Sequence, residues 1–403
     1  MEFISSKASK YGAKMCGRSF RGRLKIALRV YFLLVVLCLG IPGNAGGDEI
    51  ENSSTILEPE VSAGGAVLMD RESGRVLWGR NIHQRRYMAS TTKIMTALVA
   101  IQEGDLEDVV KVSPKAASVE GSSVYLEAGE EKKLEELLYG LILRSGNDAA
   151  LAIAEHVGGS VENFNRLMTE KAREIGAENT FFQNPHGLHH DNHYSTAYDL
   201  ALIASYALEN EVFRGIVSAP RAIISWPSQR WNRVLHNQNK LLHLYEGADG
   251  VKTGWTSPAG RCFVGSATRA GWQLVVVVLN APDMWEDAQN LLDYGFNAYE
   301  RQQLLHKNQE LKKVKIENGL RENCRIEAGG YFYYPLSQDE LNEVRYKFFI
   351  KNSYPAPVIK GELLGTVKLM LGKVEIGEVE LVAGEDVDRQ PFYQPLVEWW
   401  LKS

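Results

Sequence analysis

A serine and a lysine lie three residues apart in the segment YMASTTKIMTAL. Ser90 and Lys93 precede an apolar helical repeat that begins at Ile94, so their side chains should share one face of a helix start. A serine hydroxyl becomes a strong nucleophile when a base takes its proton. A lysine can be that base when burial and nearby positive charge lower its pKa. The alternative is structural: Ser90 caps the helix and Lys93 is a solvated charge.

Two further motifs whose residues could take part in catalysis follow along the chain. Ser145 and Asn147 lie in RSGN, between two apolar helical stripes, where a hydroxyl can relay a proton and an amide can hold a substrate carbonyl. Lys252, Thr253 and Gly254 lie on a β-rich run, where a cation and a hydroxyl suit a carboxylate and glycine admits a substrate backbone. Each motif is weak alone. SxxK, SxN and KTG occur once each, in that order, and together they indicate one catalytic site.

The periodicity around these motifs predicts an α+β domain that would position them. Apolar runs at 66–69 and 76–78 flank the turn RESG and predict a β-hairpin. Three β-rich runs within 251–279 predict an antiparallel meander, with a helix following near 287–301. We expect the first and last strands to share one sheet. After about residue 302, short alternating runs predict a small all-β domain of sandwich type.

The two ends of the chain differ in composition from its middle. Residues 1–45 hold eight basic residues and one acid, then a twelve-residue apolar run and small residues at Gly43 and Ala45, which predicts a secretory signal peptide. An uncleaved N-terminal anchor is the alternative. The tail contains Trp399 and Trp400 and is too short to span a bilayer, so it either lies at a membrane surface or docks on the β domain. The predicted segments are signal peptide 1–45, linker 46–60, catalytic domain 61–301, all-β domain 302–390 and apolar tail 391–403.

Charge and cysteine content exclude several functional classes. Removal of residues 1–45 changes the net charge from −5 to −12, which disfavours nucleic-acid binding. Outside the leader only Cys262 and Cys324 remain, so we expect neither a disulfide framework nor a paired-cysteine zinc site. The histidine-rich stretch HGLHHDNH shows no readable carboxylate second shell, and serine chemistry needs no metal. We therefore predict no metal and no cofactor.

The chain resembles a known enzyme family in the segments that carry these motifs. YMASTTKIMTAL, LILRSGNDAALAIAE, NPHGL with STAYDLALIA, and GADGVKTGWTSPAGRCFVGSATR are similar to the serine-type D-alanyl-D-alanine carboxypeptidases, the low-molecular-mass penicillin-binding proteins. The resemblance covers roughly residues 60 to 390. It implies a β-lactamase/transpeptidase-like domain, in which an antiparallel sheet with helices joins a helical subdomain, followed by the all-β domain. It also implies a peptidoglycan pentapeptide as substrate and β-lactams as covalent inhibitors. The predicted signal peptide places this activity across the cytoplasmic membrane, on its extracellular face or in the cell wall.

The resemblance assigns catalytic roles to three residues. Ser90 would attack the carbonyl between the last two D-alanines, Lys93 would accept its proton, and Ser145 would pass a proton toward the leaving amine. Hydrolysis of the acyl-enzyme at Ser90 would complete the release of D-alanine.

It also assigns five residues to substrate binding. Asn147 would orient the acyl side, and Lys252 and Thr253 would contact the terminal carboxylate. Gly254 would let the substrate lie against the strand, and the backbone N–H of Trp255 would form the oxyanion hole with that of the nucleophile.

The sequence departs from the family in one place and leaves three rival functions open. Many relatives carry a basic residue in the stretch that here reads PDMWEDAQN, so carboxylate recognition would rest on the KTG residues or on an arginine not placed by sequence. A β-lactamase of this fold would need an ExxxN glutamate, whereas Glu170, Glu174 and Glu178 fall in or beside a predicted helix. A DD-endopeptidase uses the same residues. A catalytically silent peptidoglycan-binding module should have lost some of them.

Overall fold

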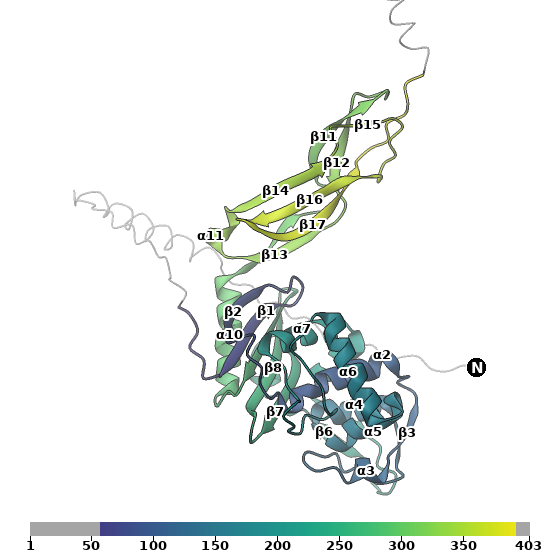
Figure 1. Ribbon diagram of the computed structural model, residues 1–403, viewed down its shortest axis with the longest axis vertical. Helices are drawn as coiled ribbons and strands as arrows, with labels where there is room; N and C mark the ends of the chain where they lie inside the picture. The colour runs from purple at the N-terminus through teal and green to yellow at the C-terminus, as the bar shows by residue number, and fades with distance from the viewer. Residues whose placement is uncertain (1–56, 392–403) are drawn as a thin grey trace, which may run out of the picture. The chain divides into compact units, whose positions relative to one another are not determined.

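The computed structural model describes residues 57–391 (Figure 1). The predicted signal peptide and nearly all of the predicted apolar tail lie outside the described residues. Within 57–391, no helix combines the length and the apolar character needed to cross a membrane.

A five-stranded antiparallel sheet forms the centre of the first domain. Its strand order is β2-β1-β9-β8-β7, and the first strand pairs with the last of the meander, which confirms that the two ends of this domain share one sheet. β9 reads WQLVVVVL rather than alternating, because both faces of the sheet are covered. β7 is an edge strand, so one side of the KTG segment is free of sheet partners. The strands are β1 (Gly65–Asp70), β2 (Val76–Arg80), β7 (Ala248–Thr256), β8 (Gly260–Arg269) and β9 (Trp272–Leu279).

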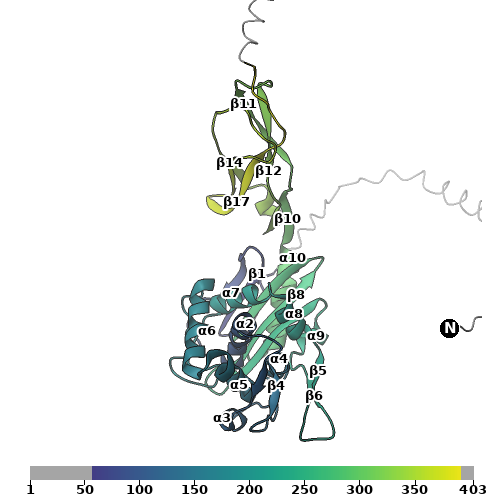
Figure 2. The same ribbon diagram turned by 90° about the vertical axis from the view of Figure 1, so that its right-hand side faces the viewer.

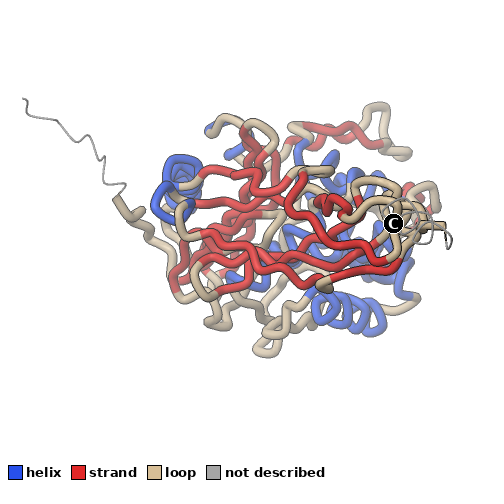
Figure 3. The backbone as a smooth tube through the Cα atoms, turned by 90° about the horizontal axis from the view of Figure 1, so that it is seen from above, coloured by secondary structure: helices blue, strands red, loops and turns tan. Residues whose placement is uncertain are grey.

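Helices cover the two faces of this sheet separately. α10 (Met284–Ala298) packs on one face, and α7 (Ala197–Ala207) and α8 (Glu211–Ser218) contact strands from the other. In Figure 3, α10 is seen at the left, most of the other helices lie on the right, and strands lie between them. The sequence predicts this helix near 287–301; in the structure α10 begins and ends three residues earlier. Tyr299 is already extended, and the chain continues as a strand from Glu300.

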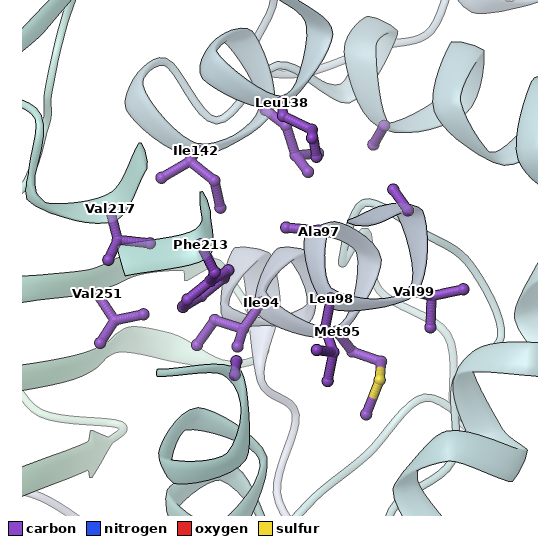
Figure 4. Packing of buried hydrophobic residues seen from close by; sticks show 14 of the residues in the cluster. Ile94, Met95, Ala97, Leu98, Val99, Leu138, Ile142, Phe213, Val217 and Val251 are labelled. Carbon is purple, nitrogen blue, oxygen red and sulfur yellow. The ribbon is translucent and has the colours of Figure 1, made fainter. Parts of the chain in front are cut away.

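The helix that follows Ser90 lies in the interior of the domain. α2 (Lys93–Glu103) is surrounded by α4 (Leu134–Leu143), α5 (Asn147–Gly158) and α6 (Val161–Ile175). It also contacts α7, α8 and β7. Its first eight residues are all buried. Figure 4 shows Ile94, Ala97 and Leu98 of this helix among side chains of α4, α8 and β7. A lysine at the first position of so buried a helix cannot be a solvated surface charge.

The remaining elements complete the catalytic domain and build a second, all-β region (Figures 1 and 2). In that region one six-stranded sheet has the order β14-β16-β17-β12-β11-β15, beside a two-stranded β10–β13 ribbon. Its core is separate from the two cores of the first domain. The other elements of the first domain are the 3₁₀ helix Ala89–Thr92, β3 (Val109–Lys111), α3 (Pro114–Ala117), β4 (Glu131–Lys133), β5 (Arg221–Ile224), β6 (Arg233–His236) and α9 (Leu241–Leu244), and those of the second are β10 (Glu300–Leu305), β11 (Glu310–Glu317), β12 (Asn323–Ala328), β13 (Phe332–Leu336), α11 (Gln338–Leu341), β14 (Val344–Ile350), β15 (Ser353–Pro355), β16 (Leu363–Leu371) and β17 (Val374–Ala383).

Candidate active site

Ser90 and Lys93 contact each other at the junction between the 3₁₀ helix and α2. Lys93 Nζ lies 3.0 Å from Ser90 Oγ, within hydrogen-bond distance. The helix has no side-chain cap, so Ser90 is not an N-cap. Lys93 is fully buried, with 0% of its surface exposed. The structural alternative for this pair, a capping serine with a solvated lysine, therefore does not describe the molecule.

The ammonium of Lys93 has three oxygen acceptors, and this number matters for catalysis. Besides Ser90 Oγ, Nζ donates to Asn147 Oδ1 at 2.8 Å and to the main-chain carbonyl of His186 at 2.6 Å. A protonated amine uses all three donors here, whereas a neutral amine donates two hydrogen bonds and accepts one. With the amide and carbonyl oxygens able only to accept, the one hydrogen bond that can reverse is the bond to Ser90. The neutral amine is thus oriented to receive the serine proton.

The electrostatic surroundings favour that neutral amine. Burial lowers the pKa of Lys93 well below its ordinary value, and the nearby charge of Lys252 lowers it further, while Asp148 acts in the opposite direction. Desolvation is the largest cause, because α2 carries the amine into the core rather than into water. The structure thus provides both conditions for a lysine base: contact with the hydroxyl and a depressed pKa.

Asn147 is held in place by the loop between α3 (Pro114–Ala117) and β4 (Glu131–Lys133). Its backbone N–H donates to Ser122 O and its Nδ2 to Glu120 O, both at 2.7 Å. These contacts aim Oδ1 at Lys93 and leave a second Nδ2–H for another acceptor. The buried carboxylate of Asp148 accepts hydrogen bonds from the backbone N–H groups of Val124 and Leu126 in the same loop. The SGN segment and this loop therefore form one hydrogen-bonded unit.

The KTG strand passes very close to the nucleophile. A Cβ placed on Gly254 would lie 2.8 Å from the backbone nitrogen of Ser90, which no real side chain tolerates. Glycine is therefore required for β7 to approach the 3₁₀ helix. Lys252 is buried on the inner side of the strand, where burial lowers its pKa to about 7, and its Nζ donates to Thr253 O at 2.9 Å.

Two non-glycine residues beside the nucleophile adopt left-handed backbone conformations. Ala89 has φ +47°, and Ser145 has φ +59°. Such conformations are unfavourable for residues with a Cβ and persist where the surrounding structure imposes them, often at functional sites. The conformation of Ala89 sets the direction of the backbone just before Ser90, and that of Ser145 places its side chain in the lining of the cavity.

These groups open into a cavity of about 510 Å³. Of the eight predicted site residues, Ser90, Ser145, Thr253, Gly254 and Trp255 line it directly. Lys93, Asn147 and Lys252 are each at most 3% exposed and lie behind this lining. The structure therefore brings all three motifs together around one cavity, five residues at its surface and three beneath.

Two cations in this cavity were missed by the sequence reasoning. Arg261 and Lys240 both line it, together with Met284 from the stretch PDMWEDAQN. Arg261 stands opposite Trp255 in the β7–β8 register, and its Nη1 donates to Pro282 O at 2.7 Å. The signal for Arg261 was present, because the PAG turn predicts a hairpin that pairs the two strands. Nothing in the sequence pattern signals Lys240.

Other candidates in the sequence take structural roles. The histidine-rich loop contributes the His186 carbonyl to Lys93, while the buried ring of His193 contacts Thr92 Oγ1 at 2.7 Å. Burial lowers the pKa of both imidazoles to about 3, so they stay neutral near pH 7. Among residues 57–391, no three His, Cys, Asp or Glu side chains are grouped to hold a metal ion.

Replacing Lys252 with methionine should stabilise the fold while lowering activity. In the folded state its pKa is about 7, against 10.5 ordinarily, so between these values the unfolded chain binds one more proton and wild-type stability rises with pH. Methionine removes the desolvation penalty, so the free energy of unfolding at pH 7 should increase by up to ~4 kcal/mol. Thermal melts from pH 7 to 10 measure this, and the gain should shrink with rising pH. Lys240→Met, an exposed lysine of the same cavity, is the control. A gain that grows with pH would contradict the expectation.

The contact between a serine and a buried lysine is the arrangement that a serine acyl-transfer enzyme with a lysine base requires, and comparison with known proteins identifies the family of the chain. Residues 52–283 match the D-alanyl-D-alanine carboxypeptidase family, and residues 299–389 match the C-terminal domain of penicillin-binding protein 5. The chain is 36% identical over 342 residues to the D-alanyl-D-alanine carboxypeptidase DacF of Bacillus subtilis, covering 81% of this chain and 86% of the relative.

Solved structures agree with this match. Penicillin-binding protein 5 from Haemophilus influenzae superposes with a TM-score of 0.70 at 30% identity, covering 83% of this chain and 99% of that one. A DD-transpeptidase of Streptomyces K15 gives a TM-score of 0.58 at 33% identity, covering 60% and 100%. The chain belongs to the family of D-alanyl-D-alanine carboxypeptidases, which are penicillin-binding serine peptidases. The α+β domain with a C-terminal all-β domain is confirmed by the same matches.

Proposed function

We propose that this protein removes the terminal D-alanine from peptidoglycan stem peptides through an acyl-enzyme at Ser90. The observation that carries the proposal is the contact between Ser90 Oγ and the buried Nζ of Lys93, 3.0 Å apart, beneath a cavity lined by the KTG strand. The family membership supplies the substrate class.

Acylation follows from the geometry of the site. Ser90 Oγ attacks the carbonyl carbon of the penultimate D-alanine as its proton moves to Lys93 Nζ. The backbone N–H groups of Ser90 and Trp255 stabilise the oxyanion, a role supported by the close approach of β7 to the Ser90 nitrogen. The C–N bond then breaks, and the leaving amine takes a proton through Ser145. Asn147 offers its remaining Nδ2–H to a carbonyl on the acyl side.

Deacylation returns the enzyme to its starting state. A water molecule attacks the ester carbon and transfers a proton toward Lys93, and the Ser90 oxygen leaves and is reprotonated. A β-lactam enters by the same first step, but its ring-opened leaving group stays attached to the acyl-enzyme. Slow hydrolysis would make this adduct an inhibitor and a label.

Arg261 is the cation that we assign to the terminal carboxylate. Its guanidinium lines the cavity beside Trp255 and keeps N–H donors beyond the one given to Pro282. A charged hydrogen bond of this kind contributes about 1.5–3 kcal/mol, so Arg261→Ala should lower kcat/KM by about 10- to 100-fold. The measurement compares a D-Ala-D-Ala peptide with its C-terminal amide. The loss in kcat/KM should be confined to the peptide with a free C-terminal carboxylate. An equal loss for the peptide and its amide would contradict the assignment.

One assay tests the proposed function. The protein is incubated with a fluorescent penicillin and, separately, with a diacyl-lysyl-D-Ala-D-Ala peptide. We expect a stable covalent label, mapped to the Ser90 peptide by mass spectrometry, and release of D-alanine. Rapid penicillin hydrolysis without peptide cleavage would instead identify a β-lactamase, and cleavage of crosslinked dimers alone a DD-endopeptidase. Absence of both label and cleavage would indicate a binding module.

A second candidate activity is favoured by the similarity to the Streptomyces DD-transpeptidase. Transfer of the acyl group to an amine, instead of to water, needs no further catalytic residue. The same assay with added glycine as acceptor separates the two. A product extended by glycine in place of the hydrolysed peptide would make transpeptidation the main reaction.

The location of this activity also belongs to the proposal. The basic leader with its short apolar run supports export, and a peptidoglycan substrate supports action outside the cytoplasmic membrane. The apolar tail supports peripheral membrane contact. Fractionation of cells expressing the full chain, and a chain ending at residue 391, measures both: the truncated protein should shift from the membrane to the soluble fraction.

A further inference from the structure

His193 is a buried imidazole close to the reacting groups, and no step of the proposed reaction uses it. The residue is 2% exposed, and its two ring nitrogens contact two different segments of the chain. Nδ1 accepts a hydrogen bond from the backbone N–H of Gln183 at 3.0 Å, and Nε2 lies 2.7 Å from Thr92 Oγ1. A buried ring with both nitrogens bonded in this way fixes the two segments relative to each other.

The contacts of this ring define its tautomer and the direction of its hydrogen bonds. A ring nitrogen that accepts a hydrogen bond carries no proton, so the proton is on Nε2 and is donated to Thr92 Oγ1. Burial keeps the ring neutral, because it lowers the pKa of His193 to about 3. Thr92 Oγ1 in turn donates to the carbonyl of Ala89 at 2.8 Å. The hydrogen bonds therefore run in one direction, from the ring through the hydroxyl to the backbone.

The Thr92 side of this network holds the backbone that presents the nucleophile. Ala89, whose carbonyl ends the chain of hydrogen bonds, has φ +47° and directly precedes Ser90. A left-handed alanine is unfavourable by itself and persists where its surroundings impose the conformation. The hydrogen bond from Thr92 Oγ1 fixes the Ala89 carbonyl and so stabilises the conformation from which the chain enters Ser90.

The Gln183 side of the network leads to the carbonyl that accepts a hydrogen bond from Lys93. Gln183 lies three residues before His186, whose carbonyl oxygen is 2.6 Å from Lys93 Nζ. Gly187, the next residue, packs directly on the 3₁₀ helix, because a Cβ there would lie 2.0 Å from the Ala89 carbonyl oxygen. Both ends of the network thus meet at the contact between the nucleophile and its base.

Resting on the proposed function, we infer that His193 is a positioning residue that sets the placement of Ser90 Oγ relative to Lys93 Nζ. The neutral amine directs its lone pair at the serine because its other two hydrogen bonds go to Asn147 and to the His186 carbonyl. When that carbonyl moves away, the amine is free to turn its lone pair elsewhere. A displacement of about 1 Å at reacting groups lowers a rate by about 100-fold. Loss of the hydrogen bonds of the ring should therefore slow acylation without weakening substrate binding.

Substitutions of the ring and of the hydroxyl test this role. His193→Phe keeps a planar ring but removes both hydrogen bonds, and the rate constant for acylation by a chromogenic β-lactam should fall by about 10- to 100-fold. The dissociation constant of the non-covalent complex that precedes acylation should stay unchanged. Thr92→Val removes the hydroxyl at nearly constant size and should lower the same rate constant. Thr92→Ser restores the hydroxyl and should retain most of the wild-type rate.

A matched control and the wild-type protein separate this inference from the proposed function. His190→Gln changes an exposed histidine of the same loop and should leave the acylation rate unchanged. Melting temperatures show which variants are folded, and the two Thr92 variants decide the result if His193→Phe does not fold. A wild-type rate in folded His193→Phe or Thr92→Val, or a loss confined to the dissociation constant, would overturn the inference and leave the proposed function intact. Absence of a covalent label on the wild-type protein would overturn both.

Discussion

Ser90→Ala should abolish both the release of D-alanine and covalent labelling by penicillin. The hydroxyl forms the bond to the acyl group, so no other side chain can replace it without a different mechanism. Removal of a catalytic serine nucleophile lowers kcat by up to about 10⁶-fold in serine hydrolases, and we expect a loss of at least ~10⁴-fold here. The measurement is kcat for a D-Ala-D-Ala peptide together with gel fluorescence after penicillin incubation.

The alanine variant should still fold and bind. Ser90 is not a helix cap, and within the described chain its hydroxyl forms hydrogen bonds only with Lys93 Nζ and, at 3.5 Å, the His186 carbonyl. Its removal should therefore leave the melting temperature nearly unchanged. Peptide should still bind non-covalently, as judged by calorimetry. Residual labelling at another residue would show that the nucleophile lies elsewhere.

Lys93→Arg should inactivate the enzyme almost as completely as loss of the serine. Arginine keeps the positive charge but stays protonated at any accessible pH, so it cannot accept the proton of Ser90. General-base catalysis contributes about 10²–10⁴-fold, which sets the expected loss in acylation rate. Stopped-flow acylation by a chromogenic β-lactam measures this step alone. Lys240→Arg, the same change at an exposed lysine of the cavity, is the matched control and should be close to wild type.

The pH dependence of the acylation rate is a second test of the role of the Lys93 amine. The active form of Lys93 is neutral, and burial holds its pKa well below the ordinary value. The acylation rate should therefore rise with pH and level off above that lowered pKa, without a rise that continues toward pH 10.5. Lys252→Met removes a positive neighbour that lowers the pKa of Lys93, so the rising limb should move to higher pH. A limb that moves to lower pH, or an active arginine variant, would show that the lysine is not the base.

Much of the catalytic apparatus was predictable because its signals are local. The SxxK, SxN and KTG motifs are each a few residues long, and helical or strand periodicity places each on an element without knowledge of the rest of the chain. The hairpin and meander followed from alternating apolar runs, and the pairing of the first and last strands from the need to bury them in one sheet. The helix near α10 was shifted by three residues because apolar periodicity marks a face more clearly than an end.

What the sequence alone determined is the set of reacting groups, the α+β class of the first domain and the β class of the second. The state of those groups was decided by tertiary packing. Whether Lys93 is a solvated charge or a buried base depends on α4, α5 and α6, which enclose α2 and come from residues far along the chain. The His186 carbonyl and the cations Arg261 and Lys240 also join the site from distant segments, and a backbone carbonyl has no sequence signature. Desolvation and three-dimensional contact depend on which segments meet, and spacing along the chain does not encode that.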